Sequence, residues 1–249
     1  MPARIPGSPN AAPAIAPAAP ATDPALPPKP KFRGVLHQAA FFLAIPAGVV
    51  LVAFAPETTT ARVAAAVYAL SLAALFGASA AYHRGDWSPE RLSIMRRLDH
   101  SMIFVLIAGT YTPVCLLVLP SPWSWVFLSV VWAGAAAGIT LKILRIDGFA
   151  RTSAALYITL GWVAIFALPF MVSRLPAVTM TLIAVGGVLY TVGAIVLASN
   201  RPNPSPTWFG YHEIWHSFTI AAGACHYIAI WLIVLLAGHG GVAARGGLG

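Results

Sequence analysis

The chain has 249 residues, of which 59% are hydrophobic and only 9% are charged, and its net charge is +8. Because an ordinary soluble domain carries about a quarter charged residues, this composition argues against a water-soluble globule. The basic residues lie between apolar runs and form no stripe with interleaved aromatic residues. Their placement argues against nucleic-acid binding and indicates membrane topology instead.

The first segment of the chain, residues 1–30, is rich in alanine and proline and contains no long apolar core. It does not resemble a cleavable signal peptide, and we expect a disordered tail here. A membrane domain is predicted over residues 31–238, followed by a short flexible tail over residues 239–249.

Seven apolar runs follow in chain order, each close to the roughly 20 residues that are needed to cross about 30 Å of hydrocarbon. They lie near residues 35–54, 64–83, 101–119, 123–141, 153–172, 178–198 and 212–236. Because the bilayer core offers no water to backbone groups, each run is predicted to be a helix. The sequence therefore predicts an all-α, integral membrane bundle of seven transmembrane helices, with connections too short for a soluble domain.

Lysine and arginine are unevenly divided between the two sides of this predicted bundle, with twelve on one side and three on the other. Cytoplasmic loops carry the excess of these residues in membrane proteins. We therefore expect a cytoplasmic amino terminus and, because seven crossings reverse the side, a carboxyl terminus outside. The expected location is the bacterial inner or plasma membrane.

Histidine and aspartate residues at the predicted cytoplasmic helix ends are the candidates for chemistry, because ionisable groups at membrane depth usually mark function. His212 and His216 are four residues apart, so they share one face of the last helix and can chelate one ion. His83 closes the second predicted helix, and Asp99 opens the third. The predicted orientation places all four at matching depth.

Three neutral imidazoles suit zinc and leave a fourth position open for water, which is typical of a catalytic site. The pattern thus predicts a zinc site at His83, His212 and His216. Asp99 could hold the water or act as its general base. Ser79, one turn before His83, could orient water or substrate through its hydroxyl group.

The remaining histidines have simpler interpretations. A single histidine at a helix end usually reaches the membrane interface or bonds a backbone group, and His37, His226 and His239 are interpreted in this way. His100 is adjacent to Asp99 but points about 100° away from it on the same helix.

Residues 212–216 (HEIWH) also match HExxH, the motif in which two histidines bind zinc and the glutamate is the general base of a metalloprotease. No acidic residue follows Glu213, so a third ligand would have to come from upstream, from His83 or Asp99. Glu213 could face the cavity, but as an exposed group, or one that supports a ligand, at the start of its helix it would also complement the helix dipole. Intramembrane proteolysis is kept as an alternative.

Several of these segments together resemble the hemolysin III branch of the progestin and adipoQ receptor family, over residues 30–240. The motifs that carry the resemblance are residues 79–84 (SAAYHR), 97–101 (RLDHS), 108–113 (AGTYTP), 212–216 (HEIWH) and 225–227 (CHY). The resemblance implies seven helices and a zinc ion held by His83, His212 and His216, with Asp99 and Ser79 beside it. The wider superfamily includes alkaline ceramidases and adiponectin receptors with lipid amidase activity.

The leading hypothesis is therefore a zinc-dependent hydrolase of a lipid amide or ester, involved in membrane homeostasis, whose membrane lipid substrate enters from the bilayer between the helices. An alternative is a non-enzymatic channel, a hemolysin-like pore former or a lipid-state sensor in which the zinc is structural. The HExxH intramembrane protease is the second alternative.

Overall fold

A computed structural model of the chain describes residues 29–144 and 150–238. Within these residues the helices are α1 (Val35–Ala53), α2 (Thr59–Arg84), α3 (Pro89–Leu117), α4 (Trp123–Leu144), α5 (Ala150–Gly161), α6 (Ala164–Val172), α7 (Ala177–Ser199) and α8 (Tyr211–Gly238). Seven spans in this part of the chain are long and apolar enough to cross a membrane, with α5 and α6 joined in one of them. The all-α seven-helix bundle is thus confirmed. The tails predicted over residues 1–30 and 239–249 lie outside the described residues, apart from residues 29 and 30.

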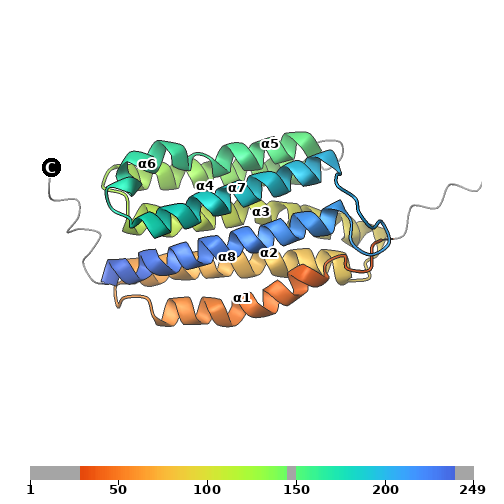
Figure 1. Cartoon of the computed structure of the whole chain (residues 1–249), viewed down its shortest axis with the longest axis horizontal. Helices are drawn as coiled ribbons and strands as arrows, with labels where there is room; N and C mark the ends of the chain where they lie inside the picture. Colours follow the sequence, from red (N-terminus) through yellow and green to blue (C-terminus); the bar gives the residue numbers. More distant parts are fainter. Residues whose placement is uncertain (1–28, 145–149, 239–249) are drawn as a thin grey trace, which may run out of the picture.

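The helices run side by side along one long axis (Figure 1). α3 packs against α2, α4 and α8, and α8 also packs against α7 and α1. α1 lies against α2, and α5 lies against α7. This arrangement brings α1, α2, α3 and α8 together, although α8 follows α3 by almost a hundred residues.

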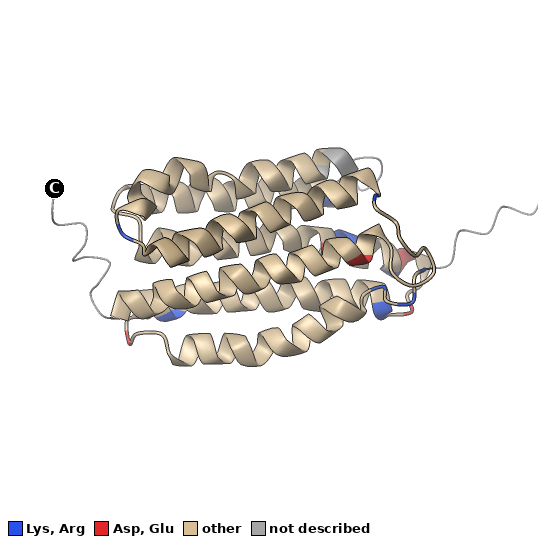
Figure 2. Cartoon of the chain, in the orientation of Figure 1, with Lys and Arg blue, Asp and Glu red and all other residues tan. Residues whose placement is uncertain are grey.

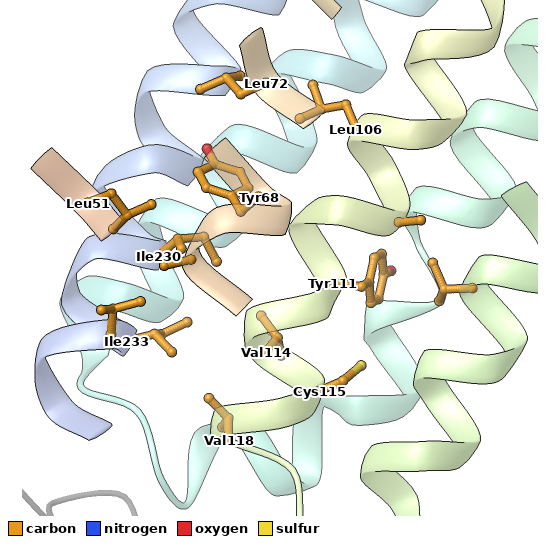
Figure 3. Packing of buried hydrophobic residues seen from close by; sticks show 14 of the residues in the cluster. Leu51, Tyr68, Leu72, Leu106, Tyr111, Val114, Cys115, Val118, Ile230 and Ile233 are labelled. Atoms are coloured by element: carbon orange, nitrogen blue, oxygen red, sulfur yellow. The ribbon is translucent and has the colours of Figure 1, made fainter. Parts of the chain in front are cut away.

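Apolar side chains from these four helices form the centre of the bundle. Figure 3 shows Leu51 of α1, Tyr68 of α2 and Val114 of α3 close to Ile230 and Ile233 of α8. All five side chains are buried. Because lipid is as apolar as these residues, close packing and interhelical contacts, more than exclusion of water, hold such helices together.

The third helix begins twelve residues earlier than the run predicted at 101–119. Ser88 accepts a hydrogen bond from the backbone N–H of Arg91, and Pro89 occupies the first turn, which is a standard way to begin a helix. The prediction that Asp99 opens this helix was therefore wrong, since Asp99 lies ten residues inside it. Hydropathy missed the first turns because they carry charged residues and extend beyond the apolar run.

The fifth predicted helix, 153–172, is interrupted between α5 and α6. The Tyr111 hydroxyl of α3 donates to the carbonyl oxygen of Gly161 at 2.7 Å and accepts from the backbone N–H of Ala164 at 2.6 Å. A side chain that inserts into the backbone hydrogen bonds of a helix is a recognised cause of such a break. An apolar run alone gives no sign of it.

Basic residues gather at one end of the bundle, which we call the basic end (Figure 2). Arg84 ends α2, Arg91 lies in the first turn of α3 and Arg201 follows α7 at this end. Arg62 and Arg174 are the basic residues at the opposite end within the described parts of the chain. α1 and α8 both begin at the basic end, which places their first turns beside the last turn of α2.

Candidate metal centre

Three histidines meet at the basic end, between the last turn of α2 and the first turns of α8. The Nε2 atoms of His83 and His212 are 3.1 Å apart. The ring of His216 lies 5.2 Å from that of His83 and 4.7 Å from that of His212, measured between centroids. One ligand atom from each residue lies within 4.8 Å of the others, so the three histidines could hold a metal ion.

The chemistry and spacing of this group fit a zinc ion. Two imidazole nitrogens at zinc distance and a tetrahedral angle are about 3.3 Å apart, close to the 3.1 Å between His83 and His212. The ring of His216 supplies the third nitrogen of a set whose members all lie within 4.8 Å of one another. The ligand positions expected from spacing and depth are therefore brought together.

Asp99 and Ser79 lie beside the histidines. The Oδ2 atom of Asp99 is 4.0 Å from the Nε2 atom of His83, and the two side chains are 14% and 5% exposed. Asp99 and the buried Ser79 line a polar cavity of about 200 Å³ together with His212 and His216. The carboxyl group of Asp99 also interacts with the side chain of Ser79.

His37 is a member of this cluster that the sequence analysis missed. Its ring stacks on that of His216, with centroids 3.7 Å apart and planes 12° apart, and it lines the polar cavity. Phe76 packs edge-on against it at 5.1 Å. His37 does not reach the membrane interface, the first of its two expected positions, because the packing of α1 against α8 buries it. No spacing along the chain relates the two residues.

Glu213 takes no part in the cavity. Its side chain is fully buried, and its carboxylate accepts hydrogen bonds from the guanidinium of Arg33 and from the backbone N–H of Gly210, the latter at 2.8 Å. A glutamate in the first turn of a helix commonly reaches back to the preceding backbone in this way. Glu213 is thus not an exposed group, and its engagement away from the cavity argues against its use as a protease base.

The segment before α1 covers the cluster at the basic end. The backbone N–H of Phe32 donates to the carbonyl oxygen of Trp208 at 3.2 Å, and the Lys31 ammonium lies 3.8 Å from the centroid of the Trp208 ring. Gly34 has φ +79°, and a Cβ atom there would lie 2.6 Å from the Cβ of His83. Only glycine allows the chain to pass so close to His83 in this conformation.

A second, apolar cavity of about 270 Å³ lies deeper in the bundle, between α3, α5, α6, α7 and α8. Residues that line both cavities are Leu75, Ile103, Tyr157, Trp215 and Thr219. The two cavities therefore adjoin, and α8 supplies part of the wall that they share.

Two further histidines of the described residues are not among the three candidate ligands. His226 approaches the carbonyl oxygen of Ile183 at 3.2 Å through its Nε2 atom, which confirms the expected bond to a backbone group. His100 lines the polar cavity, and its carbonyl oxygen accepts a hydrogen bond from the Tyr157 hydroxyl. His239 lies outside the described residues.

The helices and the histidine cluster together define a multi-pass membrane protein with a site that could hold a metal ion. The sequence profile of the family described as Haemolysin-III related matches residues 27–227. The chain belongs to this family, the hemolysin III branch of the progestin and adipoQ receptor family, and is thus a multi-pass bacterial membrane protein.

Similar proteins span most of the chain. Hemolysin-3 of Bacillus cereus is 34% identical over 203 residues, which cover 81% of this chain and 90% of the relative. The Hemolysin-3 homolog of Bacillus subtilis (strain 168) is 32% identical, covering 79% and 90%. The human monocyte to macrophage differentiation factor is 27% identical and covers 76% of this chain and 79% of its own length.

Proposed function

We propose that this protein is a zinc-dependent hydrolase that acts on an amide or ester bond of a membrane lipid and serves membrane homeostasis. The observation that carries the proposal is the junction of two cavities, one polar and lined by His212, His216, Asp99 and Ser79, the other apolar. A lipid substrate needs both environments, because its reacting polar group and its hydrocarbon chain must be bound at once.

His83, His212 and His216 would hold the zinc ion. Three imidazoles form a ligand set that zinc accepts in catalytic sites, and the 3.1 Å between two of their nitrogens supports this assignment. When bound, zinc supplies a Lewis acid that polarises a carbonyl group and activates water. His216 is buried and His83 and His212 are partly buried, which limits the contact of the three rings with bulk water.

Asp99 would act as the general base. Its Oδ2 atom lies 4.0 Å from the Nε2 atom of His83, so the carboxylate lies directly beside the three candidate ligands. Asp99 would take a proton from the attacking water at this oxygen and return it to the leaving amine or alcohol. The Ser79 hydroxyl would orient the Asp99 carboxylate or the substrate carbonyl.

The hydrocarbon chain of the substrate would occupy the apolar cavity. Trp162, Ile165 and Leu168, near the break between α5 and α6, line this cavity and are also exposed on the outer surface of the bundle. The cavity thus extends to a face that the bilayer would contact. This supports entry of a lipid sideways from the membrane, between the helices.

We also propose that the basic end faces the cytoplasm, with the amino terminus inside and the carboxyl terminus outside. The support is the gathering of lysine and arginine at that end of the described bundle. The metal centre would then lie near the cytoplasmic leaflet.

The experiment that tests the hydrolase combines metal analysis with lipid turnover. Protein purified in detergent without chelators should contain about one zinc per chain, and the His212→Ala/His216→Ala variant should contain none. His226→Asn, which alters a buried histidine outside the cluster, should keep the metal. Wild-type protein should release fatty acid from at least one of a panel of lipid amides and esters, measured by mass spectrometry. Zinc-free wild-type protein would remove the hydrolase proposal.

A second candidate function, a lipid-state sensor or pore former with a structural metal, is supported by the position of the histidines, which would tie the ends of α2 and α8 together. In that case zinc would be present but no lipid would be hydrolysed. Removal of the zinc would lower the melting temperature, and a pore former would conduct ions across a planar bilayer.

A further inference from the structure

We propose that His37 is a positioning residue, which holds the ring of His216 in its metal-binding orientation by stacking on it. The inference rests on the proposed metal site and adds a residue from α1 to it. It concerns a residue with no sequence relationship to the three candidate ligands, which come from α2 and α8.

His216 lacks the usual means of fixing a metal-binding imidazole. Such a ring normally donates its second N–H to a carboxylate, a carbonyl oxygen or water, and this bond sets its orientation. The Nδ1 atom of His216 is buried and has no hydrogen-bond partner among the described residues. Among the described residues, only a contact other than this hydrogen bond restrains the ring.

The contact with His37 has a geometry that supplies this restraint. The two rings lie almost face to face, 3.7 Å apart between centroids and 12° from parallel. Aromatic rings of like charge distribution avoid this arrangement and prefer an offset or edge-on one. Stacking becomes favourable when one ring is electron-poor, as an imidazole is when a metal ion draws electron density from it. The geometry thus fits a His37 ring that stacks on a metal-bound His216 ring.

His37 is itself held from several directions. The edge of Phe76 packs against its ring at 5.1 Å. Arg33, four residues earlier in the chain, pairs with Glu213 of α8 and so fixes the position of α1 along α8. Neither ring nitrogen of His37 makes a hydrogen bond of standard geometry within the described structure, and the ring also interacts with the backbone of His216.

The test compares a flat and a non-flat replacement of His37. Phenylalanine keeps a flat ring without nitrogen atoms, whereas leucine fills space without a flat face. The zinc dissociation constant of each purified variant is measured by competition with a chromophoric chelator, and the visible spectrum is recorded after cobalt substitution. We expect His37→Phe to match wild type in both measurements and His37→Leu to bind zinc about 10- to 100-fold more weakly. Phe42→Leu, which changes an exposed ring of α1 outside the stacked pair, is the control.

Each outcome decides the proposal. Equal loss of affinity in both variants, with an altered cobalt spectrum, would make His37 a ligand and overturn the positioning role. Wild-type zinc affinity in both variants would show that stacking on His37 does not position the His216 ring. Wild-type protein without metal would instead refute the metal site itself, which is measured first. Melting temperatures of the metal-free forms check folding, and His37→Gln replaces His37→Leu if the leucine variant does not fold.

Discussion

Arg33, just before α1, forms an ion pair with Glu213 of α8 across 180 positions of the chain, and the Glu213 carboxylate is fully buried. The pair lies directly beside the candidate metal centre, because Glu213 follows His212 in the chain. It therefore links the covering segment at the basic end to the helix that carries two of the three candidate ligands.

Removing the Arg33 side chain should lower the free energy of unfolding more than neutralising Glu213 does. Arg33→Met leaves a buried carboxylate without its cation, which should lower the free energy of unfolding by about 3–5 kcal/mol. Glu213→Gln should lower it less, because the Arg33 side chain is 19% exposed and can reach water. Unfolding in mixed micelles with rising dodecyl sulfate measures both. Glu57→Gln, in an exposed pair with Arg62 at 3.8 Å, should change almost nothing.

The same Glu213→Gln variant separates hydrolysis of lipids from proteolysis. We expect it to keep both its zinc and its lipid turnover, because Glu213 does not line the polar cavity. Complete loss of a proteolytic activity in a folded, zinc-loaded Glu213→Gln protein would identify this residue as a catalytic base after all.

Asp99→Asn should separate catalysis from metal binding. The amide keeps the shape of the carboxyl group but cannot accept the proton, so lipid turnover should fall about 10²- to 10⁴-fold while zinc content stays near wild type. Turnover is followed by mass spectrometry of released fatty acid. Asp86→Asn, which alters an exposed carboxylate of the loop after α2, serves as the control. Unchanged turnover in Asp99→Asn would exclude Asp99 as the base.

The orientation can be tested with one cysteine at each end of the bundle. Glu57 lies in the α1–α2 connection, and Asp86 lies in the α2–α3 connection at the basic end. With Cys115 and Cys225 replaced by serine, a membrane-impermeant maleimide should label Glu57→Cys in intact cells. It should label Asp86→Cys only after the membrane is opened. The reverse pattern would place the basic end outside.

Tyr111→Phe should weaken the junction of α5 and α6. It removes a buried hydroxyl that bonds both Gly161 and Ala164, which should cost about 1–3 kcal/mol of stability. Amide hydrogen exchange at Ala164 should also become faster. Tyr227→Phe, which removes a single bond to the carbonyl oxygen of Ala47, should have a smaller effect. An equal effect of the two changes would contradict a special role for Tyr111.

Hydropathy was sufficient to predict the seven spans, because a segment that crosses a bilayer must be a helix that is both long and apolar. Hydropathy did not predict the helix boundaries that depend on capping residues or on contacts between helices. The charged first turns of α3 depend on the helix start at Ser88 and Pro89, and the break after α5 depends on a hydroxyl from α3.

The three candidate ligands could be predicted for a similar reason. Four-residue spacing relates His212 to His216, and the charge asymmetry places His83 at the same depth. His37 and Arg33 could not be found in this way, because only the packing of α1 against α8 brings them to the cluster. Local rules describe one helix at a time and do not encode such contacts.

The two cavities differ in polarity and share one wall, and this bears on what would follow the proposed hydrolysis of a lipid between them. The fatty fragment would remain among apolar side chains next to the bilayer, while the polar fragment would leave through the basic end into water. Because the two products would then enter different phases, they would rarely meet again at the site. The proposed hydrolysis would therefore be effectively irreversible.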